Sequence, residues 1–133
     1  MDKGIYNLII YLGSDKLIPI GKLGSFLFKK GYYIYTGSAK KGLKARVERH
    51  KRRGKAIHWH IDYLLEEATI IDVKVSNEES STECRLNERI FQIGGAELVT
   101  PGFGASDCKC RSHLAYFREL PEVICLKRTG GIH

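Results

Sequence analysis

The chain has 133 residues, of which 43% are hydrophobic and 10% aromatic, and its formal net charge is +7. This composition excludes a disordered chain, and the length favours one globular domain over residues 1–133. No apolar run approaches the roughly 20 residues of a membrane span, and the first strand lacks the basic leader of a signal peptide, so we expect a cytoplasmic protein without membrane contact.

The first part of the chain is predicted to consist of strands. Residues 4–12 are apolar almost throughout, which is typical of a strand covered on both faces. A Gly-Ser-Asp turn follows, and residues 16–37 read as short strands, of which residues 32–36 are the strongest. This part therefore predicts a small sheet with tyrosine-rich strands.

Helical periodicity begins only after these strands. The first helix opens at Ser38 or Lys40 and ends at Gly54. A second helix over 58–68, a strand over 69–76 and a third helix over 80–93 follow, and the remaining residues read as a loop between short strands. This order predicts an α+β fold in which helices flank a sheet.

Many of the chain's cations gather in the segment 40–55, which includes the first helix. A cationic groove gains affinity for a nucleic acid by releasing counterions, although a run of charges can also be a solvated helix face. We favour nucleic acid, because the charges are so concentrated. The candidate nucleic-acid contacts are Lys40, Lys41, Lys44, Arg49 and Arg53.

Two residues of the first helix lie close to its apolar stripe. At about 100° per residue, Arg46 and His50 flank the stripe formed by Leu43 and Val47. At this rim a guanidinium can hold a phosphate and an imidazole can titrate near neutral pH. A boundary histidine beside an arginine that extends to solvent is the alternative interpretation.

The third helix carries a carboxylate on its apolar side. Glu83 shares a face with the predicted buried stripe Leu86, Ile90 and Ile93. A charge at such an edge needs a partner or a metal ion. The alternative is a capping box, Ser80-x-x-Glu83, in which the carboxylate bonds to the start of the helix.

The four cysteines are too few and too irregular for a disulfide scaffold, so we expect thiols. A structural zinc at Cys108, Cys110 and His113, with Cys84 as a further ligand, is the less favoured alternative. The segment His58-Trp59-His60-x-Asp62 also resembles a metal cluster. Helical geometry turns His60 away from the other two ligands, so we favour a packed Trp59 with polar neighbours.

Taken together, these motifs resemble the GIY-YIG nuclease family over about residues 3–93. The resemblance is carried by Gly4-Ile5-Tyr6, Tyr35-Thr36-Gly37, Gly42-x-x-x-Arg46-x-x-x-His50 and Glu83-x-x-Leu86. The chain departs from the family pattern in three ways. The two tyrosine motifs are far apart in the sequence, which implies an extra hairpin between them. Threonine replaces the central isoleucine of the second motif. Many members carry an asparagine after the glutamate, and we cannot identify an equivalent residue in this chain.

The resemblance implies a fold and a chemistry. The fold would be a small antiparallel sheet of three strands flanked by helices, with an extra hairpin, a core over about 3–93 and a C-terminal strand extension over about 94–133. The activity would be hydrolysis of DNA phosphodiester bonds in repair or recombination, with one Mg²⁺ or Mn²⁺ held by Glu83. The residues carried over are Tyr6, Tyr35, Arg46, His50 and Glu83.

Individual roles also follow from the resemblance. Tyr6 would orient or deprotonate the attacking water with assistance from His50, Tyr35 would hold the phosphate, and Arg46 would neutralise developing negative charge. The subgroup that this chain resembles is also found attached to DNA-repair glycosylase-like proteins, which makes such a protein a possible partner. The alternative function is a module that binds nucleic acid without cutting it.

Overall fold

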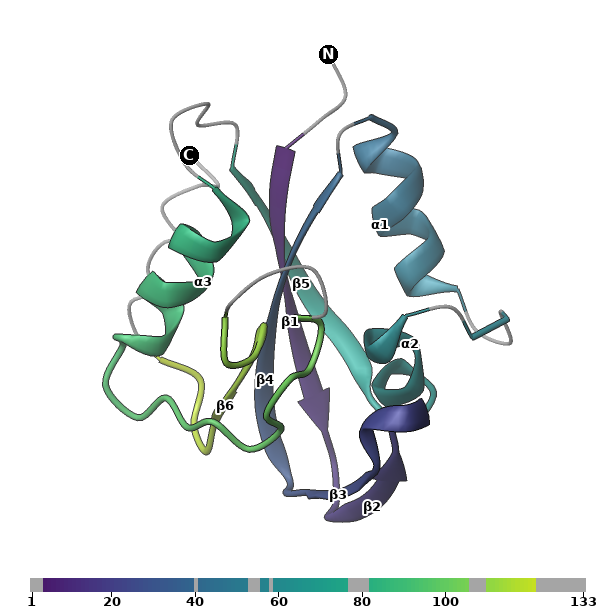
Figure 1. Ribbon diagram of the computed structural model, residues 1–133, viewed down its shortest axis with the longest axis vertical. Coiled ribbons are helices and arrows are strands. Elements are labelled where there is room, and N and C mark those ends of the chain that lie inside the picture. Colours follow the sequence, from purple (N-terminus) through teal and green to yellow (C-terminus); the bar gives the residue numbers. More distant parts are fainter. Residues whose placement is uncertain are drawn as a thin grey trace.

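The computed structural model describes most of the chain, in six ranges. These ranges are 4–39, 41–52, 56–57, 59–76, 82–105 and 110–121. They form an α+β fold in which an antiparallel sheet is flanked by helices, which confirms the predicted fold class (Figure 1).

The main sheet has four strands in the order β5-β1-β4-β6. Its strands are β1 (Gly4–Leu12), β4 (Gly31–Ala39), β5 (Thr69–Ser76) and β6 (Leu114–Phe117), and each neighbouring pair is antiparallel. The prediction of three strands is therefore wrong. The additional strand, β6, is four buried residues from the C-terminal extension that pair with Tyr32–Tyr35 of β4.

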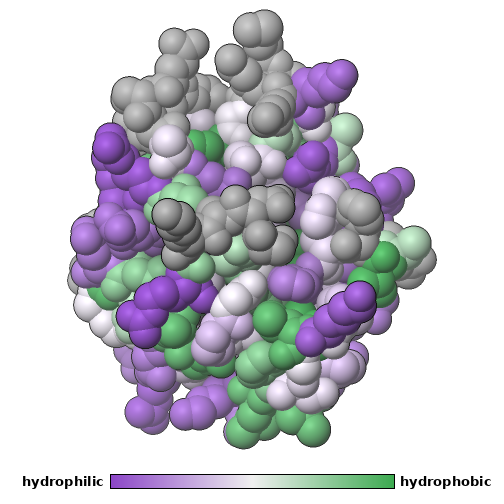
Figure 2. Space-filling view, in the orientation of Figure 1, coloured by the Kyte–Doolittle hydropathy of each residue, from purple (hydrophilic) through white to green (hydrophobic). Residues whose placement is uncertain are grey.

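The predicted extra hairpin is present between β1 and β4. It consists of β2 (Lys16–Pro19) and β3 (Ser25–Phe28), joined by the short 3₁₀ helix η1 (Gly21–Leu23). Leu17 and Leu27 of this hairpin are largely exposed, and Figure 2 shows hydrophobic surface at the corresponding end of the molecule.

The first helix, α1 (Leu43–Lys51), begins later than predicted. Ser38 belongs to β4, because residues up to Ala39 pair with β1 and their backbone therefore has the extended conformation of a strand. Gly42 then takes a left-handed conformation, with φ of 69°, immediately before the helix. The predicted end at Gly54 and the predicted start at Lys40 lie outside the described residues.

Two further helices complete the described fold. They are α2 (His60–Leu65) and α3 (Glu83–Phe91). In α3 the hydroxyl of Thr82 accepts a hydrogen bond from the backbone N–H of Arg85 at 3.1 Å, so Thr82 caps the helix. The predicted capping residue Ser80 lies outside the described residues, and Glu83 is the first residue of the helix.

The helices cover opposite faces of the sheet (Figure 1). One core includes Tyr6, Tyr33 and Tyr35 together with apolar residues of α1 and α2. The other packs α3 against Ile9, Ile34 and Phe117. Within the described residues, no helix has the length and apolar character needed to cross a membrane.

Candidate active site

The two motif tyrosines lie side by side on adjacent strands, as expected. In the β1–β4 register, Tyr6 is opposite Gly37 and Leu8 is opposite Tyr35. Residues two apart on a strand point to the same face, so both phenols project from one side of the sheet. Their ring centroids are 6.4 Å apart.

Gly37 makes this arrangement possible. A Cβ atom at this position would lie 2.7 Å from the Tyr6 ring and its hydroxyl, and 3.0 Å from the Tyr35 ring. Any side chain there would therefore displace Tyr6. The second motif therefore requires glycine at this position, because the phenol of the first motif packs directly against its backbone.

His50 joins the two tyrosines from α1. Its side chain is buried, and its Nε2 lies 2.8 Å from the hydroxyl oxygen of Tyr6. The imidazole centroid is 5.5 Å from the Tyr6 ring and 6.2 Å from the Tyr35 ring. When Nε2 carries no proton, it can accept the hydrogen of the Tyr6 hydroxyl.

Arg46 brings a positive charge to the same hydroxyl. Its Nη1 donates to the backbone oxygen of Ser38 at 2.9 Å, and its guanidinium is close enough to the Tyr6 hydroxyl to interact with it electrostatically. Burial raises the pKa of Tyr6, and although the charge and hydrogen bond of Arg46 lower it, the net effect is a rise to about 12. The phenol therefore stays protonated at neutral pH unless a base takes its proton.

Glu83 extends from α3, which packs on the other face of the sheet, to the end of β4, where its charge interacts with that of Arg46. Its Oε1 accepts a hydrogen bond from the Ser38 hydroxyl at 2.6 Å, and its Oε2 lies 2.8 Å from Nδ1 of His113. Burial raises the pKa of Glu83, but the hydrogen bonds from His113 and Ser38 and the charge of Arg46 outweigh it and lower the pKa. Glu83 is therefore ionised at neutral pH.

His113 is a part of the site that the sequence did not predict in this role. Its Nδ1 also lies 3.1 Å from the backbone oxygen of Thr36. Burial lowers the pKa of His113, but its hydrogen bonds with Glu83 and Thr36 outweigh burial and raise it to about 10. The site thus pairs a buried imidazolium with a partly exposed carboxylate beside Ser38.

Glu83 can hold a divalent cation. A carboxylate has about four lone-pair positions, and the described contacts of Glu83 use one on each oxygen. Its side chain is 30% exposed, so hydrated cations can reach it. Asp62, by contrast, has a fully buried side chain that is already bound to Arg49, which makes it unsuitable as a ligand.

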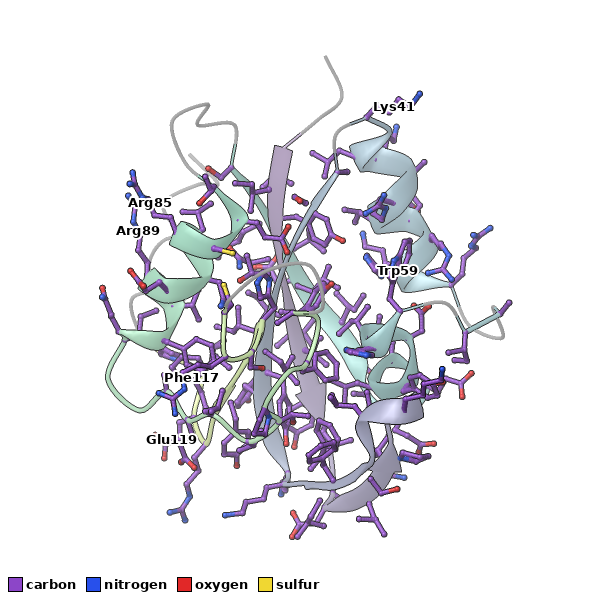
Figure 3. All side chains as sticks on the ribbon, in the orientation of Figure 1. Lys41, Trp59, Arg85, Arg89, Phe117 and Glu119 are labelled. Atoms are coloured by element: carbon purple, nitrogen blue, oxygen red, sulfur yellow. The ribbon has the colours of Figure 1, made fainter. Side chains whose placement is uncertain are left out.

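The predicted nucleic-acid contacts differ in their surroundings. Lys41 and Lys44 are exposed, and Lys41 points away from the sheet at the start of α1 (Figure 3). Arg49 binds Asp62 through both terminal nitrogens, at 3.0 and 3.1 Å. Its place in a DNA interface stays a prediction, and Lys40 and Arg53 lie outside the described residues.

Trp59 packs against its neighbours, which agrees with our interpretation of this segment as a packed tryptophan and not as a metal cluster. The guanidinium carbons of Arg46 and Arg49 lie 4.8 and 4.5 Å from the centre of its ring, beside α1 (Figure 3). Asp62 accepts a hydrogen bond from the backbone N–H of Trp59, whereas Nδ1 of His60 accepts one from Gly104. The polar groups of this segment therefore hold α2 in place, and His58 lies outside the described residues.

The predicted stripe of α3 is confirmed in part. Ile90 and Ile93 pack against the second core, although they and Leu86 are only partly buried. The fully buried side chain of this helix is Asn87, whose carboxamide donates to the backbone oxygen of Ser112 at 2.7 Å. The apolar pattern did not reveal Asn87, because a polar residue gives no hydrophobic signal.

Three of the candidate zinc ligands also come together. Cys84, Cys110 and His113 place one ligand atom each within 4.8 Å of one another. Cys108, which the sequence grouped with them, lies outside the described residues.

The comparisons with known proteins give a family without an assigned activity. No curated protein and no solved structure matches the chain. One family model matches residues 5–129, which include both the tyrosine strands and β6. The chain belongs to this family, which is described as a domain of unknown function, DUF123.

Proposed function

We propose that the chain is a GIY-YIG-like endonuclease that hydrolyses DNA phosphodiester bonds with one Mg²⁺ or Mn²⁺. The observation that supports this proposal most is the grouping of Tyr6, His50 and Arg46 around one hydroxyl, with Tyr35 against the same imidazole. These residues come from two strands and a helix, and they are the ones that the resemblance singles out.

A proton relay is the chemistry that suits this geometry. When Nε2 of His50 carries no proton, the Tyr6 hydroxyl donates to it, so the Tyr6 oxygen can accept a proton from an attacking water as its own proton passes to the imidazole. With a pKa of about 12, Tyr6 is a poor base by itself. The relay solves this problem, because His50 takes the proton and no free phenolate has to form.

Arg46 and Glu83 would stabilise the negative charge of the phosphate, directly in one case and through a metal ion in the other. The positive charge of Arg46 acts on the Tyr6 hydroxyl, and at this position it can stabilise charge that develops on a phosphate during attack. Glu83 is the residue that would hold the divalent ion, and such an ion polarises the phosphate and assists the leaving oxygen. The hydrogen bonds from Ser38 and His113 fix the carboxylate, which favours a single position for the ion.

The DNA path proposed here runs along the outer side of α1. Lys41, which lies just before this helix, and Lys44, which lies within it, are both exposed. Arg52, which follows the helix, is exposed as well. These residues contribute to affinity and take no part in the proton relay.

A pair of conservative substitutions tests the proposal. Tyr6→Phe removes only the hydroxyl bound to His50, whereas Tyr11→Phe removes a hydroxyl from the same strand away from the site. On a panel of branched and damaged DNAs with Mg²⁺ or Mn²⁺, we expect Tyr6→Phe to lose cleavage by at least about 100-fold, the size of a general acid–base contribution. The Tyr11→Phe variant should cut like wild type, and equal cleavage by both variants would contradict the relay.

A second candidate function is a module that binds DNA for a repair glycosylase without cutting it. Both phenol side chains lie in the core, with Tyr6 only 2% exposed, and this burial favours a structural role for them. Salt-sensitive DNA binding without cleavage of any substrate on the panel would favour this alternative.

A further inference from the structure

Two thiols and an imidazole meet where α3 approaches the segment that leads into β6. Cys84 lies in the first turn of α3, whereas Cys110 and His113 precede β6, and their ligand atoms lie within 4.8 Å of one another. Cys84 and Cys110 are both thiols. In Figure 3, sulfur atoms are visible beside α3 on the side that faces the sheet.

The spacing of these atoms is close to that of a tetrahedral metal site. With Zn–S bonds of about 2.3 Å and Zn–N bonds of about 2.0 Å, neighbouring ligand atoms lie roughly 3.5–3.8 Å apart. The Cys84 sulfur is already 3.9 Å from Nε2 of His113. Side-chain rotations of the size that ordinary rotamer relaxation allows would close the remaining gaps.

His113 is oriented as metal-binding histidines usually are. Its Nδ1 lies between two acceptors, Oε2 of Glu83 at 2.8 Å and the backbone oxygen of Thr36 at 3.1 Å, so this nitrogen carries hydrogen. The other nitrogen, Nε2, faces Cys84, and a metal ion bound there would take the place of its proton. A carboxylate behind a histidine is the common outer contact in zinc sites.

A cavity of about 800 Å³ lies next to the thiols. Cys84, Cys110 and Asn87 line it. Asn87 is 3% exposed, and within the described part of the chain its Oδ1 has no hydrogen-bond partner. A buried acceptor beside the cavity suits a water or another ligand that completes the coordination of a metal ion.

We propose that Cys84, Cys110 and His113 bind one Zn²⁺, with a fourth coordination position on the side of the cavity. Two thiolates and one imidazole form a donor set that selects zinc over magnesium. Such an ion would join α3 to the segment before β6. Because Glu83 is the neighbour of Cys84 and bonds to His113, the ion would also position the carboxylate of the candidate active site.

This proposal does not rest on the nuclease activity, and its test does not measure cleavage. The full chain, reduced and freed of metal with a chelator, is titrated with Zn²⁺ and separately with Co²⁺. We expect one equivalent to bind, and the cobalt form should show the intense visible bands of a tetrahedral ion and thiolate-to-cobalt charge transfer. A weak octahedral cobalt spectrum without charge transfer would overturn the proposal.

Substitutions identify the ligands. Cys84→Ser and Cys110→Ser should each lose charge-transfer intensity and weaken zinc binding by more than about 100-fold, because changes in outer contacts alone cost about 10–100-fold. Tyr6→Phe serves as the matched control, since it alters the candidate nuclease site and should bind zinc like wild type. Unchanged zinc affinity in both cysteine variants would contradict the assignment.

A measurement on the wild-type chain covers the case in which a cysteine variant does not fold. Alkylation of each thiol is followed by mass spectrometry with and without one equivalent of Zn²⁺. We expect zinc to slow the labelling of Cys84 and Cys110 at least tenfold. Equal labelling of both thiols in the presence and absence of zinc would refute the site.

Discussion

Replacing Arg49 should lower the stability of the fold, and we expect this loss to be larger than any direct effect on DNA affinity. Its guanidinium binds both carboxylate oxygens of Asp62, whose side chain is fully buried, and also donates to the backbone oxygen of Ala56 at 2.9 Å. Asp62 in turn accepts the backbone N–H of Trp59 at the start of α2. The pair therefore joins α1 to α2.

The size of the effect follows from this burial. Removing one partner of a buried ion pair costs about 3–5 kcal/mol, because the remaining charge loses its counterion in a poorly solvated place. The side chain of Arg49 is 20% exposed, so water can replace part of the lost interaction. We therefore expect Arg49→Ala to lower the free energy of unfolding by about 3 kcal/mol, the lower end of that range.

Urea unfolding followed by circular dichroism measures this loss. Lys44→Ala is the matched control, because Lys44 is an exposed cation of the same helix, and its loss should change stability by less than about 0.5 kcal/mol. Adding Asp62→Asn to Arg49→Ala removes the stranded charge, so the double variant should lose less than the sum of the two single losses by at least about 1 kcal/mol. Equal stability of Arg49→Ala and Lys44→Ala would refute the structural role of this pair.

Three further predictions concern the site and its surface. Gly37→Ala should lower the free energy of unfolding by about 1–3 kcal/mol, because the added Cβ would collide with the Tyr6 phenol. The control, Gly94→Ala, adds a Cβ where space is open and should change the free energy of unfolding by less than about 0.5 kcal/mol. Stability should fall as pH rises from 10 to 12, since an unfolded tyrosine ionises near 10 and Tyr6 near 12. In urea unfolding across this range, Tyr6→Phe should reduce the fall by up to about 1.4 kcal/mol per pH unit. In fluorescence-anisotropy titrations of DNA, Lys41→Gln with Lys44→Gln should lower the slope of log affinity against log salt by about 2, and an unchanged slope would place the DNA elsewhere.

The sequence predicted the strands of the site well because their patterns are local. Residues 4–12 and 32–36 are apolar and tyrosine-rich, and they form adjacent strands as expected. The helix that carries Arg46 and His50 was also predicted, although its start was misplaced. The start was misplaced because Ser38 pairs with β1, and the residues around Ser38 do not reveal this long-range interaction.

The contacts made by the C-terminal extension could not be predicted in the same way. β6 is only four residues long, and its place beside β4 depends on tertiary packing. His113 reaches Glu83 and Cys84 through this strand, although it lies 29 residues from Cys84 in the chain. The ion pair of Arg49 and Asp62 was missed for a related reason, since a cation in a basic segment resembles a surface charge until its partner is known.

The most direct test of the central claim compares two glutamates of α3. Glu83 is hydrogen-bonded to Ser38 and His113, whereas Glu88 is exposed. Glu83→Gln removes the charge that would bind the divalent ion, and it should cost about 1–3 kcal/mol of stability through the weakened contact with His113. Glu88→Gln leaves the site unchanged and serves as the control.

Both variants and the wild type are incubated with the DNA panel in Mg²⁺ or Mn²⁺, at a temperature where circular dichroism shows all three folded. We expect wild type and Glu88→Gln to cut the same substrate in a metal-dependent manner, whereas Glu83→Gln should bind that DNA without cutting it. Cleavage by Glu83→Gln at the wild-type rate, or no cleavage by wild type of any substrate, would contradict the proposed nuclease.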